Sequence, residues 1–291
     1  MKKLLILCIL FLLLGIQSKG QDANADYVKT HYDKTEQYIT MRDGTRLFTS
    51  IYSPKDKSKK YPIMLNRTPY TVAPYGEGKF KASLGNFPEM MKKGYIFVYQ
   101  DVRGKWMSEG TFEDIRPTKT KENKHSIDES TDTYDTIDWL VKNLKGNNGK
   151  VGMYGISYPG FYSTVSLVGS HPALKAVSPQ APVTDWFIGD DFHHGGALFL
   201  TDAFRFMYSF DAPRPKPITN ENGPKGFQLP SKDLYKFFLD NPTLSGLKND
   251  YLSHTVKFWD NLAKHSTLDT FWVARTITNH LNDVKPAVMV V

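Results

Sequence analysis

The chain has 291 residues, of which 40% are hydrophobic and 13% aromatic, and its formal net charge is +7. This length suits one large domain, or one domain with an insertion, and the apolar content excludes a disordered chain. The positive charge does not indicate a nucleic-acid partner. Three lysines lie in the N-terminal 20 residues, leaving +4, and much of the rest lies in the Lys-rich run 55–60. We expect that run to be a solvated loop, because nucleic-acid binding needs a continuous basic face with aromatic residues.

Residues 1–20 are predicted to be a secretory signal peptide. Lys2 and Lys3 precede an apolar run, 4–16, and a polar stretch with small residues follows at 17–21. The run is too short for an ordinary membrane span, so we expect cleavage near Gly20 and no stable membrane insertion afterwards. An uncleaved anchor is the alternative. The only cysteine, Cys8, lies inside the signal, so the mature chain would have neither disulfides nor a catalytic thiolate. These features predict an exported bacterial protein, either periplasmic or secreted.

After a linker at 21–33, residues 34–182 are predicted to form an α/β core. An Asp-Gly turn at 43–44 joins two strand-like runs and predicts a hairpin. An acidic segment at 128–132 suits the N-terminus of a helix that continues to residue 144. Further strands are predicted at 61–66, 95–100, 150–154 and 174–177. Alternating strands and helices predict a mostly parallel sheet with helices on both faces and the hairpin at its antiparallel edge.

The composition changes between residues 183 and 285, where aromatic, glycine and polar residues alternate. We interpret this segment as a helical cap inserted into the core. Helices are predicted at 233–239, 250–262 and 268–279, after a Pro- and Gly-rich stretch at 211–230. Residues 286–291 begin another apolar strand, and the sequence stops inside it. The remaining core strands are therefore expected beyond residue 291.

The segment Gly155-Ile156-Ser157-Tyr158-Pro159-Gly160 is the main catalytic candidate. It stands between a predicted buried strand and a helix, where a sharp turn would push the Ser157 hydroxyl out above the sheet. Gly155 and Gly160 supply the small neighbours that a close approach of strand and helix needs. The generic G-x-S-x-G pattern has glycine where this chain has Pro159. An ordinary strand-to-helix turn with an incidental serine is the alternative interpretation.

A serine nucleophile needs a histidine base and an acid that orients the base. In an α/β hydrolase these residues follow later strands of the sheet, so the triad Asp and His are expected beyond Val291. The histidines within the chain are the alternative bases: His171, His193, His194, His254, His265 and His280. His193-His194 beside Asp190-Asp191 also suggests a metal, but no third ligand is evident, and we predict no metal site.

These residues resemble the superfamily of X-Pro dipeptidyl-peptidases, cocaine esterases (CocE/NonD) and α-amino-acid ester hydrolases. In that superfamily a tyrosine follows the serine and the closing glycine comes one place late, which accounts for Pro159. Three further segments agree in order: 67–70 (RTPY), 100–110 (QDVRG with SEG), and 185–191 (DW with GDD). The resemblance extends from about residue 34 to the end. It is greatest to the glutaryl-7-aminocephalosporanic-acid acylase and α-amino-acid ester hydrolase branch.

The resemblance implies roles for five residues. Ser157 would be the acylated nucleophile, while the Tyr158 backbone N–H and the Tyr70 hydroxyl would form the oxyanion hole. Asp191 or Asp190 would belong to a carboxylate cluster that holds the substrate's α-ammonium group; a helix cap or loop ion pair is the alternative for either. Asp101 and Arg103 are expected to be structural, as a buried ion pair that supports the nucleophile turn. Family members also carry a C-terminal β-sandwich domain, which this sequence lacks.

The sequence therefore predicts a secreted serine hydrolase that cleaves ester or amide acyl bonds without a metal or other cofactor. Its substrates would be small acyl compounds: an amino-acid ester, a β-lactam side-chain amide or the N-terminal dipeptide of a peptide. Acidic residues 190 and 191 favour a substrate with a free amino group, whereas a glutaryl substrate would need a cation. An oligomer is compatible with the sequence. The alternative is a catalytically incomplete or non-catalytic binding protein on the same scaffold.

Overall fold

The computed structural model describes residues 24–86, 88–118, 126–189, 191–210, 214, 216–223, 233–252 and 256–291. The predicted signal peptide and most of the predicted linker lie outside these ranges. Within them, every helix is too short or too polar to cross a lipid bilayer.

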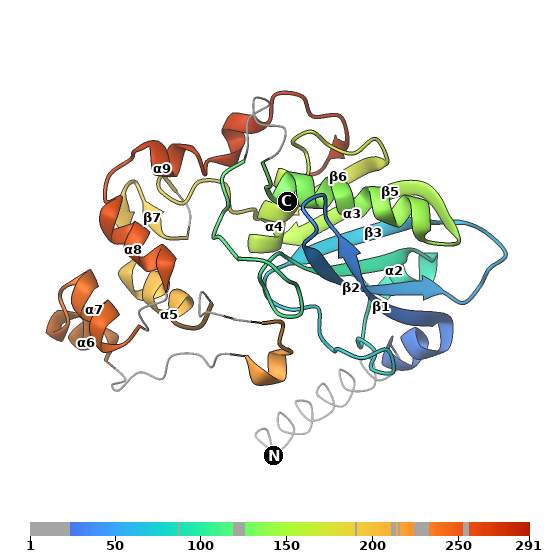
Figure 1. Cartoon of the computed structure of the whole chain (residues 1–291), viewed down its shortest axis with the longest axis horizontal. Coiled ribbons are helices and arrows are strands. Elements are labelled where there is room, and N and C mark those ends of the chain that lie inside the picture. Colours follow the sequence, from blue (N-terminus) through green and yellow to red (C-terminus); the bar gives the residue numbers. More distant parts are fainter. Residues whose placement is uncertain are drawn as a thin grey trace, which may run out of the picture.

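A seven-stranded sheet forms the larger part of the described chain (Figure 1). Its order is β1-β2-β4-β3-β5-β6-β9. The strands are β1 (Tyr32–Thr40), β2 (Arg46–Pro54), β3 (Tyr61–Thr68), β4 (Ile96–Asp101), β5 (Asn147–Ile156), β6 (Leu174–Gln180) and β9 (Ala287–Val288). The pairs β1–β2 and β2–β4 are antiparallel, and the other four pairs are parallel. The predictions of a mostly parallel sheet and of an antiparallel hairpin at its edge are confirmed.

Both faces of the sheet are covered by helices, as the buried strand sequences predict. In β4, Ile96 and Val98 join one core cluster, while Phe97 and Tyr99 join the other, because successive side chains of a strand point to opposite faces. Helices α3 (Glu129–Asn143) and α4 (Tyr158–Val165) pack on the first face. Helix α2 (Pro88–Lys93) and the helical residues 24–31 contribute to the second. This arrangement fixes the carboxyl ends of the parallel strands, where Tyr70 follows β3 and Ser157 follows β5.

Between β6 and β9 the chain forms short helices that gather beside the sheet, on the left of Figure 1. They are α5 (Leu200–Phe210), α6 (Leu234–Asp240), α7 (Leu244–Asp250), α8 (Lys257–Lys264) and α9 (Thr270–Val273), with 3₁₀ turns η1 (Asn220–Asn222) and η2 (Ile277–His280). A two-stranded ribbon, β7 (His193–His194) and β8 (Ala197–Leu198), precedes them. Aromatic side chains hold this group together, with Phe204 in contact with Phe237 and Trp259.

The helix boundaries in this segment differ from the predicted ones. The helix predicted at 250–262 is replaced by α7, which ends at Asp250, and α8, which begins at Lys257. Helix α7 was not predicted; the Thr243 hydroxyl accepts a hydrogen bond from the Gly246 N–H and caps it. The helix predicted at 268–279 breaks into α9 and η2, and the Arg275 and Asn279 N–H groups bond three residues back instead of four. Helix α5, which lines the candidate site, was not predicted.

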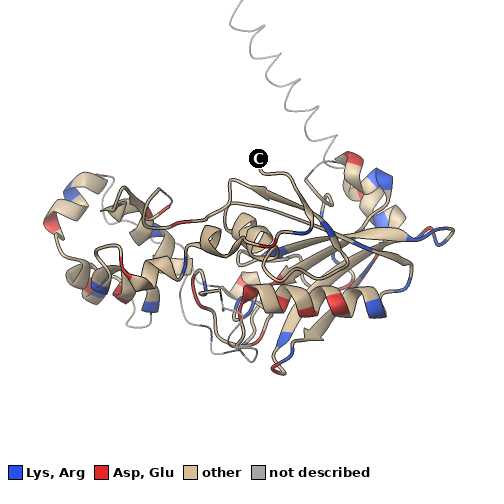
Figure 2. Ribbon diagram, turned by 90° about the horizontal axis from the view of Figure 1, so that it is seen from above, with Lys and Arg blue, Asp and Glu red and all other residues tan. Residues whose placement is uncertain are grey.

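Lysine and arginine are spread over many elements of both parts of the described chain (Figure 2). Four carboxylates lie along helix α3: Glu129, Asp132, Asp135 and Asp138. The absence of a nucleic-acid partner stays a prediction.

Candidate active site

Ser157 occupies the sharp turn between β5 and α4. Its φ is +62° and its ψ −122°, a conformation that non-glycine residues rarely adopt. The turn is held from both sides. The Ser157 N–H donates to the Gln180 carbonyl at 3.0 Å, and the Ser157 carbonyl accepts from the Phe161 N–H at 3.1 Å. Strained backbone of this kind persists only where its surroundings enforce it, and it is concentrated at functional sites.

The two glycines beside Ser157 are required by close backbone contacts. A Cβ added to Gly155 would lie 2.1 Å from the Pro159 carbonyl oxygen, and one added to Gly160 would lie 2.8 Å from the Gln180 carbonyl oxygen. Neither neighbour is a flexible side chain that could move aside. The need for small residues at both positions, predicted from the sequence, is confirmed. Pro159 is the second residue of α4, where its missing N–H costs no intrahelical hydrogen bond.

Tyr158 has a buried ring and a structural hydroxyl. The hydroxyl donates to Asp114 Oδ1 at 3.2 Å and accepts from the Ile115 N–H at 2.9 Å. Burial raises the pKa of Tyr158 well above its ordinary value, so the phenol stays neutral. The Tyr158 N–H belongs to the first turn of α4, whose N–H groups have no intrahelical acceptor. Its backbone, not its side chain, is therefore suited to contact an oxyanion.

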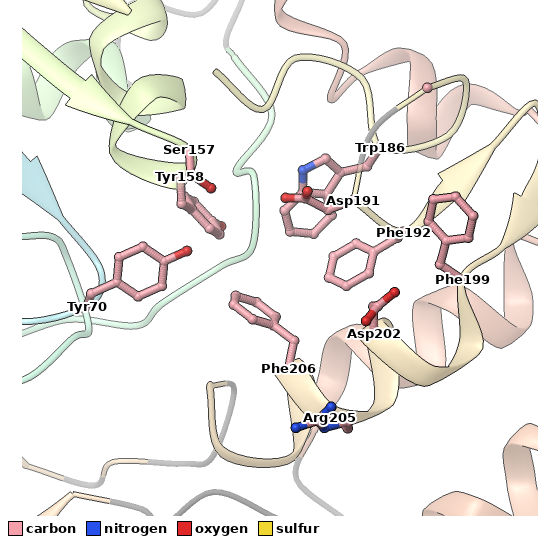
Figure 3. Close-up of a pocket in the computed structure, with 11 residues that line it drawn as sticks. Tyr70, Ser157, Tyr158, Trp186, Asp191, Phe192, Phe199, Asp202, Arg205 and Phe206 are labelled. Atoms are coloured by element: carbon pink, nitrogen blue, oxygen red, sulfur yellow. The ribbon is translucent and has the colours of Figure 1, made fainter. Parts of the chain in front are cut away.

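Tyr70 extends from the loop after β3 toward Ser157 (Figure 3). Burial raises the pKa of Tyr70, a hydrogen bond with the Ser157 side chain acts against this, and the negative charge of Asp191 raises it further. The hydroxyl is thus a neutral donor at ordinary pH, next to the serine oxygen. The ring is 42% exposed and makes an edge contact with the Tyr158 ring, 6.4 Å between centroids.

Three hydrogen bonds fix the backbone on each side of Tyr70. The Tyr70 N–H donates to Thr68 Oγ1 at 3.0 Å, and Trp106 Nε1 donates to the Pro69 carbonyl at 2.9 Å. The Val72 N–H donates to Asp101 Oδ1 at 3.0 Å. Asp101 is fully buried, and this burial raises its pKa to about 7 against the hydrogen bonds that it accepts. Asp101, the last residue of β4, therefore helps to hold the loop that carries Tyr70, the second candidate oxyanion donor.

The expected Asp101–Arg103 ion pair is wrong. Arg103 donates instead to Asp132 on α3 at 2.6 Å and to Asp43 in the β1–β2 turn at 2.7 Å. Asp101 accepts from the Val72 N–H and the Tyr75 hydroxyl, the latter at 2.9 Å. Asp101 ends β4 and Arg103 lies two residues beyond it, so each side chain meets a different neighbouring element. Both residues are structural: Arg103 joins α3 to the β1–β2 turn, whereas Asp101 holds the loop that carries Tyr70.

A cavity of about 770 Å³ opens between the sheet and helix α5, with Ser157 and Tyr70 on its wall (Figure 3). This volume is in the range of small-molecule sites. Eleven described residues line it: Tyr70, Ser157, Tyr158, Trp186, Gly189, Asp191, Phe192, Phe199, Asp202, Arg205 and Phe206. Asp191 thus shares a cavity with Ser157, whereas Asp190 lies outside the described residues. The wall supplied by α5 was missed from the sequence, where these residues were interpreted only as part of the cap at 183–285.

None of the histidines that the structure describes lines this cavity. His171 Nε2 lies 3.5 Å from Asp138 Oδ1, and His265 Nδ1 lies 2.6 Å from Asp269 Oδ2. His193 Nδ1 contacts the Trp186 carbonyl at 2.9 Å, and burial lowers its pKa. His254 is outside the described residues. Residues 191–210 and the other described ranges hold no group of three His, Cys, Asp or Glu that could bind a metal. The expectation of an acid and a base beyond Val291 stays a prediction.

Comparison with known proteins places these features in a family. The profile described as "X-Pro dipeptidyl-peptidase (S15 family)" matches residues 43–291. The cocaine esterase of Rhodococcus sp. (strain MB1 Bresler) is 31% identical over 160 residues, which is 55% of this chain and 25% of the esterase. A putative serine esterase of Mycobacterium bovis is 28% identical over 182 residues, 57% of this chain and 27% of that protein.

Two solved structures superpose closely. An aminopeptidase from a marine sediment archaeon, Thaumarchaeota archaeon, has a TM-score of 0.79 and 34% identity over 89% of this chain. A selenomethionine-labelled α-amino acid ester hydrolase has a TM-score of 0.77 and 34% identity over 92% of this chain. The present chain spans 42% of each of those two proteins. Together with the sheet order, these similarities show an α/β-hydrolase fold.

Proposed function

Because the chain belongs to the X-Pro dipeptidyl-peptidase (S15) family, we propose that it provides the nucleophile and oxyanion hole of a serine hydrolase acting on ester or amide acyl bonds. The observation that carries this proposal is the position of Ser157. It lies in a strained turn at the start of a helix, on the wall of a cavity, with a neutral tyrosine hydroxyl beside it. A packing serine would need neither the strained backbone nor the cavity.

The geometry suggests how the reaction would proceed. Ser157 Oγ attacks the substrate carbonyl carbon while a general base takes its proton, and the carbonyl oxygen becomes an oxyanion. The Tyr158 N–H and the Tyr70 hydroxyl donate to that oxygen, the first from a helix N-terminus and the second as a neutral phenol. The leaving group departs with a proton, which leaves an acyl-enzyme on Ser157. Water then attacks the ester and releases the acid. The base belongs to the part of the protein that we expect beyond Val291.

Asp191 gives the proposal a substrate preference. It lines the same cavity as Ser157, and its charge is felt at the Tyr70 hydroxyl, where it raises the pKa of Tyr70. A carboxylate at that place attracts a cation and repels an anion. We infer that Asp191 binds the free α-ammonium group of an aminoacyl substrate, so that amino-acid esters and N-terminal residues of peptides are favoured over N-acylated compounds.

One set of esters tests both parts on the full-length gene product. Wild-type protein should hydrolyse an alanine p-nitrophenyl ester with a free amino group, and Ser157→Ala should reduce kcat to background. Asp191→Asn should raise KM for the free-amino ester by about tenfold, the usual scale of one charge-assisted contact, and leave the N-acetyl ester unaffected. Full activity of Ser157→Ala would refute the serine mechanism and favour the non-catalytic binding protein. Equal effects of Asp191→Asn on both esters would refute the ammonium site alone.

A further inference from the structure

Among the described residues that line the reaction cavity, one side chain is basic. Of its three charged lining residues, Asp191 and Asp202 are acidic and Arg205 is basic. Arg205 projects from α5 and is exposed. Among the described residues, no carboxylate forms an ion pair with its guanidinium group. Asp202, one turn earlier on α5, lines the same cavity without pairing with Arg205. An arginine left this way in a substrate cavity is available to an anion from solution.

A second cavity, of about 330 Å³, adjoins the first and has a basic, aromatic wall. The two cavities share Tyr70, Arg205 and Phe206. The second is otherwise lined by Pro69, Trp106, Ser209, Phe210 and Arg214. The Arg214 guanidinium stacks over the Trp106 ring at 4.2 Å, which holds a second positive charge beside Arg205. Two arginines and no acidic residue are among the described residues that line this second cavity, and the charge of Arg214 also acts on the buried Asp101 behind it.

The two charged ends of the combined cavity are separated. In Figure 3, Asp191 and Ser157 lie toward one end of the cavity and Arg205 lies at the other end, with Tyr70 at the side. A substrate carbonyl held at Ser157 would thus have a carboxylate of the protein at its own end of the cavity and a guanidinium at the far end, past Tyr70. A short peptide with free termini has the complementary charges: an α-ammonium group before its first carbonyl and a carboxylate after it. Arginine is suited to that carboxylate because its guanidinium donates two parallel hydrogen bonds.

We propose that Arg205, next to the basic cavity that contains Arg214, is a binding site for the substrate's carboxylate on the leaving-group side. The inference rests on the proposed function, since it uses Ser157 to place the scissile carbonyl. It narrows the substrate class to short peptides, such as dipeptides, that carry both a free amino terminus and a free carboxylate. A simple ester has no carboxylate for this subsite, and a peptide with a C-terminal amide has an uncharged group in its place.

The subsite is tested by binding, so that the result does not depend on turnover. The full-length gene product carrying Ser157→Ala is titrated calorimetrically with L-alanyl-L-alanine and with its C-terminal amide. We expect the free acid to bind about tenfold more tightly, the scale of one hydrogen-bonded ion pair. Adding Arg205→Gln should bring the ratio of the two Kd values close to one, and Arg205→Lys should retain part of it. Lys257→Gln, which removes an exposed cation on α8, is the matched control and should leave the ratio unchanged.

Equal affinity for acid and amide, no measurable binding of either, or an unchanged ratio in Arg205→Gln would overturn the subsite. Hydrolysis of both ligands by the protein with Ser157 intact is measured in parallel. Absence of hydrolysis with the Kd ratio present would contradict the proposed function and leave the carboxylate site standing. Hydrolysis with equal Kd values for the acid and the amide would support the proposed function and contradict the carboxylate site.

Discussion

Two tyrosines lie next to Ser157, and the structure gives their hydroxyls different tasks. The Tyr70 hydroxyl interacts with the Ser157 side chain at the cavity wall, on a ring that is 42% exposed. The Tyr158 hydroxyl is buried and bonds to Asp114 and to the Ile115 N–H. Phenylalanine at either position removes one oxygen and little else. The pair of variants therefore separates transition-state stabilisation from folding.

The two variants are expected to change different quantities: kcat in Tyr70→Phe and the free energy of unfolding in Tyr158→Phe. Tyr70→Phe removes an oxyanion donor, which is worth about 3 kcal/mol, so kcat should fall roughly 100- to 1,000-fold with little change in KM. Its free energy of unfolding should change by less than about 0.5 kcal/mol, because the side chain is partly exposed. Tyr158→Phe takes a buried acceptor away from the Ile115 N–H. It should lower the free energy of unfolding by about 1–3 kcal/mol. Its backbone N–H remains, so kcat should stay close to that of the wild type.

The assay measures kcat and KM on a free-amino p-nitrophenyl ester together with urea unfolding, on the full-length gene product. The pH dependence adds a check. Since the pKa of Tyr70 is raised above its ordinary value of 10.0, its hydroxyl stays protonated and the rate should not fall between pH 8 and about 10 through loss of this donor. A Tyr70→Phe protein with kcat within threefold of wild type would refute the oxyanion role. A Tyr158→Phe protein that loses kcat but not stability would show that the two roles are reversed.

Gly155→Ala would place a methyl group 2.1 Å from the Pro159 carbonyl oxygen and should abolish folding or activity. Gly152→Ala on the same strand should be tolerated, because its methyl group would lie 3.4 Å from the flexible Met64 side chain and 3.8 Å from the Ala176 carbonyl oxygen, which are ordinary contacts. Circular dichroism and ester hydrolysis check both variants, and equal behaviour would contradict the close-packing argument. Asp43 provides a pH test: its burial acts to raise its pKa, but hydrogen bonds from Arg103 and Thr45 outweigh this and lower the pKa to about 2. Stability from a lowered carboxyl pKa is present above the ordinary value and is lost as pH falls toward the folded one, so the free energy of unfolding should drop between pH 4 and 2 less steeply in Asp43→Asn than in wild type. If urea unfolding shows that the free energy of unfolding falls equally steeply with pH in both proteins, Asp43 does not contribute to the acid sensitivity.

Local patterns were enough to predict the sheet. Buried runs bounded by turns indicate strands, and the Asp-Gly turn at 43–44 indicates the hairpin, because these signals depend only on neighbouring residues. The turn at Ser157 was also predictable, since Gly155 and Gly160 are needed by a contact between adjacent elements. Helix boundaries after residue 233 were predicted less well. They depend on caps such as Thr243 and on aromatic packing between helices.

The site itself required the tertiary structure. The sequence identified Ser157, Tyr70 and Asp191 as candidates, but not that they share one cavity, because they lie on three segments up to 121 positions apart. The wall of α5 and the position of Arg205 could not be foreseen, since an amphipathic helix has the same pattern whichever surface it packs against. The partners of Arg103 could not be predicted either, because the fold decides which elements lie beside it. Local sequence determined the strands and the strained turn, whereas long-range packing decided which charges face the serine.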